Sequence, residues 1–134
     1  MNVQRIAVIG SIAAVAAAVA AGLLITGSPA EQRLRRADEQ RVAELRQLAS
    51  TAEFRWNREQ RLPSVDELVD GQYLTRLPTD LATGEPYDYR VTGPRQFEVC
   101  ATFDRPSRSE LAGDFWSHEA GRRCFQFNVT DRVR

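Results

Sequence analysis

The sequence predicts an α+β protein in which an N-terminal transmembrane helix continues into an amphipathic helix, packed on a small antiparallel sheet of three to four strands. Three observations predict this class: an uncharged apolar run near the N-terminus, an apolar stripe at helical spacing after it, and alternating apolar residues in the second half of the chain. We expect a short tail at 1–5, the transmembrane helix at 6–26, a polar helical stalk at 27–41 and one soluble α+β domain at 42–134.

The apolar run extends from Ile6 to Ile25, twenty residues without a charge. A helix needs about 20 apolar residues to cross the hydrocarbon core of a bilayer, so the run predicts a membrane span. The alternative is a secretory signal peptide that is cleaved near Ala30, where small residues precede the polar part of the chain. The span is favoured because the run is longer than the roughly 7 to 15 apolar residues of a signal peptide.

Helix start signals follow the run. Ser28 and Pro29 predict an N-cap and a first helical position, and Glu31 completes a capping box. The far half of this helix carries apolar residues at spacings of three and four: Val42, Leu45, Leu48, Ala49, Ala52 and Trp56. Because this stripe covers only about two heptads, packing on the protein's own sheet is favoured over a coiled-coil seam.

A second capping box, from Ser64 to Glu67, predicts one short helix that Gly71 ends. The residues around its end offer further apolar cover for the sheet: Leu68, Val69, Tyr73 and Leu74.

Three later segments alternate between apolar and polar residues, so each predicts a strand with one apolar face. These faces comprise Tyr87, Tyr89 and Val91 in the first segment, Phe97, Val99, Ala101 and Phe103 in the second, and Phe125, Phe127 and Val129 in the third. The sequence from Thr92 to Arg95 predicts a hairpin turn between the first two segments. A long polar excursion from Asp104 to Arg123 precedes the third segment and contains Trp116 and His118.

Cys100 and Cys124 are out of phase with the apolar residues of their strands, so both are expected on the outer face of the sheet. On neighbouring antiparallel strands in the right register, two such residues come within the distance of a disulfide. The bond would close a loop of about two dozen residues and stabilise the domain by roughly 3 kcal/mol. The alternative is a pair of unlinked cysteines in a cytosolic domain.

The basic residues and the cysteines favour opposite orientations. Arg33, Arg35 and Arg36 follow the apolar run and only Arg5 precedes it, which favours a cytoplasmic domain by the positive-inside rule. A disulfide favours an oxidising compartment. We give the cysteines more weight and expect a single-pass protein of the inner membrane with a periplasmic domain.

No motif indicates catalysis, a cofactor or a metal. The 18 basic and 18 acidic residues cancel, so no overall field favours a nucleic acid partner. Asp80, Glu85 and Asp88 are of a type that suits calcium, but they lack EF-hand spacing, and a solvated loop is favoured. A nucleophilic cysteine with His118 as its base is disfavoured because no orienting or oxyanion motif accompanies this histidine, which we expect on a solvated loop.

The stretches before and inside the first strand carry a resemblance: Leu77-Pro78-Thr79-Asp80, Thr83-Gly84 and Pro86-Tyr87-Asp88-Tyr89. They look like the loop that leads into the first strand of the type IV pilin-like fold, nearest to the major pseudopilins of type II secretion, and the match runs from about 33 to 103. The resemblance implies structural roles in this loop for Asp80, Gly84, Pro86 and Tyr87. The apolar run lacks the glutamate and the leader that pilin subunits use in processing and assembly, so the resemblance implies the fold and not the filament.

The expected function is that of a non-catalytic, membrane-anchored component of the bacterial cell envelope, structural or protein-binding, held in the membrane by residues 6–26. The partner surface is expected on the long loop at Trp116 and His118, and the alternative is a solvated connector with Trp116 tucked on the core. Two other functions stay open: an anchored or secreted module that binds a small molecule or peptide, and a cytosolic-facing scaffolding domain.

Overall fold

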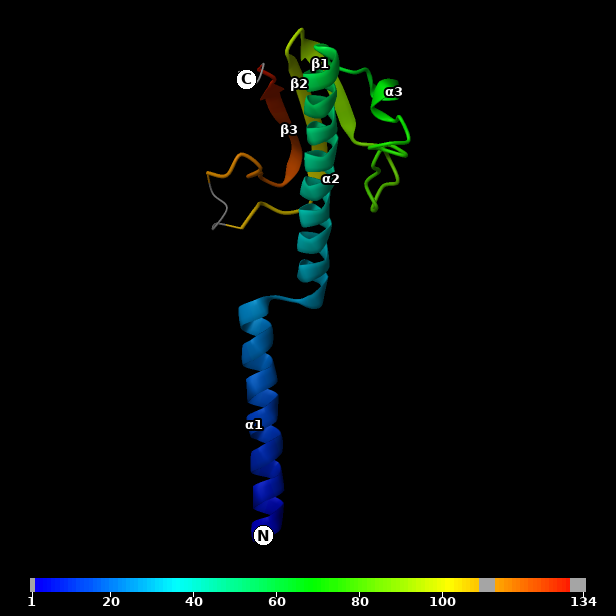
Figure 1. The fold of residues 1–134 in the computed structure, drawn as a ribbon. Helices are drawn as coiled ribbons and strands as arrows, with labels where there is room; N and C mark the ends of the chain where they lie inside the picture. Colours follow the sequence, from blue (N-terminus) through cyan, green and yellow to red (C-terminus); the bar gives the residue numbers. More distant parts are fainter. Residues whose placement is uncertain (1, 109–112, 131–134) are drawn as a thin grey trace. The chain divides into compact units, whose positions relative to one another are not determined.

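The computed structural model describes residues 2–108 and 113–130 and has the predicted α+β class (Figure 1). Its elements are α1 (Val3–Thr26), α2 (Pro29–Glu59), α3 (Val65–Leu68), β1 (Asp88–Gly93), β2 (Gln96–Phe103) and β3 (Gly121–Asn128). The chain forms two compact units, one up to Arg33 and one from Leu34 onward. The folded unit therefore includes the last residues of the segment that was predicted as a stalk.

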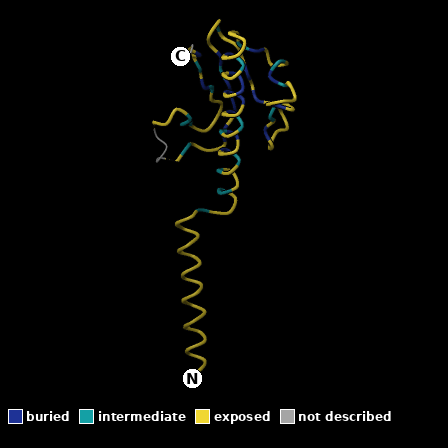
Figure 2. Tube along the Cα trace, viewed as in Figure 1, coloured by how far each residue is buried: buried dark blue, intermediate teal, exposed yellow. Residues whose placement is uncertain are grey.

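Helix α1 is the apolar run of the sequence, and none of its residues is buried (Figure 2). Among the described residues it is the one helix long and apolar enough to cross a membrane, judged by length and composition. It ends at Gly27, whose φ of 78° lies in the left-handed region that glycine adopts without strain, and whose N–H donates to the carbonyl of Leu23 at 3.0 Å.

Helix α2 begins where the sequence predicted it. The Glu31 backbone N–H donates to Ser28 Oγ at 3.2 Å, as an N-cap requires. The face of α2 that was predicted to be apolar is buried: Leu45, Leu48, Ala49, Ala52 and Trp56, with Val42 half-buried beside them. This stripe packs on the sheet of its own chain, and α2 lies across one face of that sheet (Figure 1).

The sheet has three antiparallel strands in the order β1-β2-β3, so β2 is central. Val99 faces Tyr89 of β1 and Phe125 of β3, which aligns the three apolar faces under α2. The side chains that fill this layer are aromatic or β-branched for the most part: Tyr87, Tyr89, Phe97, Val99, Ala101, Phe103, Phe125 and Val129.

Two residues that were expected to cover the core do not. Val91 is 44% exposed because it lies on the edge strand β1, next to the register shift at the hairpin. Tyr73 is 42% exposed, and its ring lies 4.5 Å from the ring of Phe54 on the outer side of α2 instead of on the sheet. Leu68 and Leu74 are buried as predicted.

The excursion between β2 and β3 is closed at its base by one pair of residues. The Ser107 N–H donates to the His118 carbonyl at 2.8 Å, and the His118 N–H donates to Ser107 Oγ at 2.8 Å. The two arms of the excursion are therefore held together, and Trp116 of its described C-terminal arm packs against Phe125 and Phe127 of β3.

Candidate interaction groove

A groove of about 320 Å³ lies between the early part of α2 and the excursion. Helix α2 contributes one wall, with Arg35, Asp38, Glu39, Val42 and Arg46. The excursion contributes the other, with Arg105, Pro106, Ser107, Arg108, Asp114, Trp116 and His118. Both residues that the sequence assigned to a partner surface, Trp116 and His118, therefore line one concave site.

Trp116 is fixed in this groove by aromatic packing. Its ring centroid lies 4.7 Å from that of Phe125 and 5.7 Å from that of Phe127, and the residue is half-buried. The guanidinium carbon of Arg46 lies 5.5 Å from the centre of the indole ring, within cation–π range. Trp116 thus packs on the core, as the connector alternative predicted, and at the same time lines the groove.

His118 differs from its prediction as a residue of a solvated loop. Its ring stacks on that of Phe103, with centroids 3.6 Å apart and an interplanar angle of 17°, and the residue is half-buried. Phe103 ends β2, far from His118 in sequence, so no local pattern indicated this contact. The stacked ring and the Ser107 hydrogen bonds fix the excursion wall of the groove.

Two arginines of the groove, Arg46 and Arg108, are held only loosely by carboxylates. Arg46 Nη2 lies 3.7 Å from Asp114 Oδ2, and Arg108 Nη2 lies 3.5 Å from Glu39 Oε1. These separations exceed those of a charge-assisted hydrogen bond, which is about 2.7 to 2.9 Å long. All four side chains are between 42% and 61% exposed, so each pair contributes little to stability.

Beside the groove lies a buried ionic cluster that was not predicted from the sequence. Arg41, 5% exposed, donates to Asp38 at 2.6 Å, to Asp104 at 2.6 Å and to both oxygens of Asp80 at 2.7 and 3.3 Å. Asp38 also accepts the backbone N–H groups of Asp104 at 3.0 Å and Arg105 at 2.8 Å. The cluster joins α2, the loop before β1 and the end of β2.

A signal for this cluster was present in the helical spacing. Asp38 and Arg41 continue the buried stripe of α2, since they precede Leu45 by seven and four residues. Charged residues on an otherwise apolar stripe indicate a buried ion pair, because burying either charge alone is costly.

The loop predicted from the pilin-like resemblance is closed by its own backbone. The Asp80 N–H donates to the Glu85 carbonyl at 2.8 Å, the Gly84 N–H donates to the Asp80 carbonyl at 2.6 Å, and the Gly84 φ of 73° favours glycine. Thr79 and Pro86 form an isolated bridge across the loop. Tyr87 donates its hydroxyl to Glu44 Oε2 at 2.6 Å; burial and this carboxylate raise the pKa of Tyr87, which keeps the donor protonated.

The partners of Asp80 give this residue a structural role in the loop. Both of its oxygens bind Arg41, and Oδ1 also accepts the Ala82 N–H at 2.7 Å. Burial is the largest influence on Asp80 and raises its pKa, but the hydrogen bonds from Arg41 and Ala82 outweigh it and leave the pKa below its usual range. The guanidinium of Arg41 already supplies the counter-charge of this carboxylate, which favours the structural role of Asp80 over a metal-binding one.

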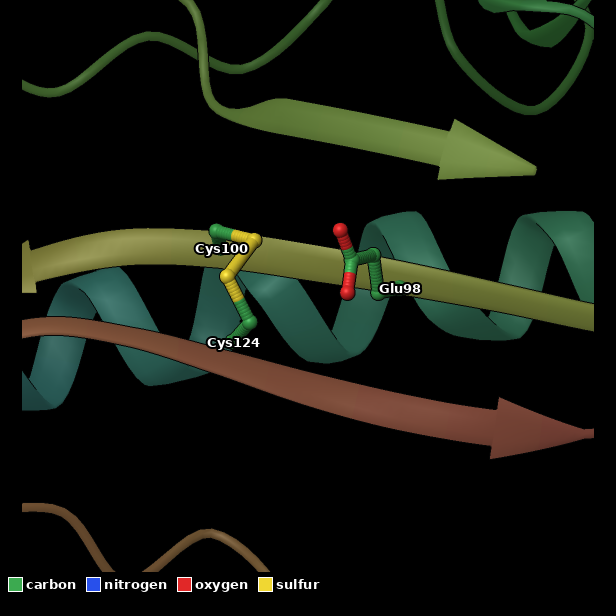
Figure 3. Close-up of side chains that lie close together, drawn as sticks. All are labelled: Glu98, Cys100 and Cys124. Carbon is green, nitrogen blue, oxygen red and sulfur yellow. A yellow bond between two sulfur atoms is a disulfide. The ribbon is translucent and has the colours of Figure 1, made fainter. Parts of the chain in front are cut away.

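The disulfide prediction is confirmed: Cys100 and Cys124 are bonded and lie directly opposite one another on β2 and β3 (Figure 3). The view in Figure 3 shows the bond on the face of the sheet away from α2, with Glu98 next to it. In the described part of the chain these three residues are the one group close enough together to suggest a metal. Bonded sulfurs are not thiolates and cannot act as ligands or as nucleophiles, so neither a metal site nor a cysteine–His118 pair forms here.

Comparisons with protein-family models, with curated proteins and with solved structures found no match for this chain.

Proposed function

We propose that this protein is a membrane-anchored, non-catalytic, pilin-like component of the bacterial cell envelope that binds a protein partner, with its folded domain on the periplasmic side of the inner membrane. One observation carries the proposal: the wholly exposed apolar helix α1 is joined to a domain closed by the Cys100–Cys124 disulfide. An apolar surface as long as α1 needs a cover, and a bilayer supplies it. The disulfide persists only where the compartment is oxidising.

The pilin-like part of the proposal has support in the order of the elements. An apolar helix is followed by a long amphipathic helix, a shaped loop and an antiparallel sheet, and this is the order of the fold that the loop sequence resembles. The loop residues act structurally: Asp80 binds α2 through Arg41, and Tyr87 binds α2 through Glu44. Such contacts position the loop against α2, which supports a structural role for these two residues.

The protein-binding part is supported by the groove. It is concave, it joins an indole platform to several guanidinium groups, and it lies on a long loop that a sheet holds in place. Trp and Arg are the side chains that most often dominate the energetics of protein interfaces. The groove is therefore the surface that we assign to the partner.

The anchoring and the compartment are tested on intact chains in membranes. A maleimide reagent of high mass is added to membrane vesicles before and after reduction, and the chain is then extracted with alkaline carbonate. We expect no labelling before reduction, two labels after it, and retention in the membrane pellet. A carbonate-soluble chain with two free thiols would overturn the proposal.

Partner binding is tested by photo-crosslinking in the same membranes. A photoreactive amino acid replaces Trp116, and a matched control carries it at Arg90, which is exposed on the opposite face of the sheet. We expect a discrete adduct with an envelope protein from position 116 and none from position 90. Equal adducts from both positions, or none from position 116, would contradict a partner at the groove.

A second function is favoured by the size of the groove. Its volume of about 320 Å³ falls at the lower end of the range for small-molecule sites. If the protein is a small-molecule or peptide binding module, the purified chain has a raised unfolding temperature with single compounds in the absence of any partner. No shift in a metabolite panel, together with an adduct at position 116, favours the first function.

A further inference from the structure

We propose that the groove recognises an acidic peptide segment of the partner, in which an apolar side chain packs on Trp116 and neighbouring carboxylates bind the arginines. This inference rests on the proposed function, because it names the chemistry of the protein partner at that site. Three observations support it: arginine side chains with unused hydrogen-bond donors, the net charge of the groove walls, and an apolar floor.

The first step concerns unused hydrogen-bond donors. Within the described residues, the guanidinium groups of Arg46, Arg105 and Arg108 donate no hydrogen bond, whereas Arg41 next to them donates four. A guanidinium has five N–H donors in a planar fork that matches a carboxylate. The three groups at the groove are therefore free to exchange water for the carboxylates of a ligand.

The second step concerns the acidic residues of the walls. Asp38 is occupied by Arg41 and by two backbone amides, so it does not attract a cation. Glu39 and Asp114 are the other wall carboxylates, each at 3.5 Å or more from its arginine. Among the described lining residues, four arginines stand against the three carboxylates of Asp38, Glu39 and Asp114, which leaves one positive charge in excess and favours a negative ligand over a positive one.

The third step concerns the apolar floor. Val42 and Trp116 are half-buried and pack on the core, so the floor is fixed before a ligand arrives. Phe125 and Phe127 contact the indole from the sheet, and the guanidinium of Arg46 lies 5.5 Å from the centre of the indole ring, so a ligand at the groove meets the ring and this cation together. A pre-organised aromatic platform costs little conformational entropy on binding. Its volume of about 320 Å³ suits one or two side chains of a peptide and not a flat array of lipid headgroups.

The test uses the full chain in nanodiscs of zwitterionic lipid and two fluorescent nine-residue peptides. One peptide has a central phenylalanine flanked by glutamates, and the other has glutamines at the same positions. Fluorescence anisotropy should show at least about tenfold tighter binding of the acidic peptide, the size of one good charge-assisted contact. The difference should shrink as salt is raised, because the contacting charges are partly exposed.

The variant R105Q/R108Q should weaken binding of the acidic peptide about tenfold and leave the glutamine peptide unchanged. The matched control is R90Q, which removes an equally exposed arginine with a 3.6 Å ion pair on the opposite face of the sheet. Unchanged unfolding of both variants in urea shows that any loss is local. A single-site variant, R46Q, gives an independent measure from the α2 wall.

Equal affinity for the two peptides, or equal effects of R105Q/R108Q and R90Q, would overturn the inference. Binding that appears only in nanodiscs with anionic lipid would assign the arginines to the membrane surface and overturn it too. A crosslinked partner at position 116 without any preference for the acidic peptide would refute this inference and retain the proposed function. Absence of both the adduct at position 116 and the preference for the acidic peptide would refute this inference and the proposed partner binding at the groove.

Discussion

Arg41 and Asp80 form a two-point ion pair, with Nε 2.7 Å from Oδ2 and Nη2 3.3 Å from Oδ1, across 39 residues of sequence. The contact ties α2 to the loop that leads into β1. Because the same guanidinium also binds Asp38 and Asp104, one buried cation fixes the loop, the helix and the start of the excursion together. The position of the groove wall at residues 104–108 depends on this cluster.

Removing the cation should cost more stability than any surface charge. In R41Q, Asp38 and Asp80 are left buried without a counter-charge, and the free energy of unfolding should fall by about 3 to 5 kcal/mol. The measurement is urea unfolding of the full chain in detergent, followed by near-UV circular dichroism. The control R90Q should change the free energy by less than about 0.5 kcal/mol, since its arginine is exposed. A loss below about 1 kcal/mol in R41Q would show that the cluster does not hold the fold.

The disulfide should stabilise the domain mainly by restricting the unfolded chain. Its cysteines are 24 residues apart, and the double variant C100S/C124S should lose about 3 kcal/mol of unfolding free energy. Urea unfolding with and without a reductant measures this loss. Reduced wild-type protein should match the variant, and the variant should not respond to the reductant. Equal stability of the oxidised wild type and the variant would contradict the expectation.

The sequence predicted the elements that follow from local periodicity, and missed contacts between distant segments. Alternation placed Phe97, Val99 and Phe125 on one face and both cysteines on the other, because strand geometry enforces that alternation. The stack of His118 on Phe103 joins residues with no shared pattern, so only the folded excursion brings it about. Val91 has the alternation that was predicted, but it lies on an edge strand where little covers its side chain. Periodicity in the sequence does not indicate which part of the chain covers a strand.

Acid should loosen the start of α3 first. Hydrogen bonds from Arg61, and then from the Ser64 backbone N–H, lower the pKa of Glu67 from 4.5 to about 2. A carboxyl group whose pKa is lower in the folded state than in the unfolded state stabilises the fold at pH values above its unfolded-state pKa. This stability is lost as the pH falls toward its folded-state pKa. Unfolding free energy should therefore decrease from about pH 4.5 down to about pH 2.

The matched variant for this pH effect is E67Q, which removes the titrating group and keeps a side chain that can still accept a hydrogen bond. Urea unfolding at several pH values should give a shallower decrease in E67Q than in the wild type. The pKa of Asp80 is also lowered, so Asp80 adds to the decrease only at pH values below its usual pKa of 3.8. This contribution should persist in E67Q. Identical pH profiles for the two proteins would mean that Glu67 is not coupled to folding.

If α1 spans the membrane, a charge at its centre should release the chain from the membrane. The run is rich in alanine, which gives it only modest affinity for the bilayer, and one arginine at its centre costs about 2.5 to 3.5 kcal/mol. A16R should therefore shift much of the chain from the carbonate-resistant membrane pellet to the soluble fraction. A16L changes the same position without a charge and should stay in the pellet like the wild type. If the wild type itself is soluble, the mass of the purified chain, which locates its N-terminus, separates the remaining explanations. A chain that begins just after Ala30 has lost α1 as a cleaved signal peptide. A chain that still carries α1 does not use this helix as an anchor.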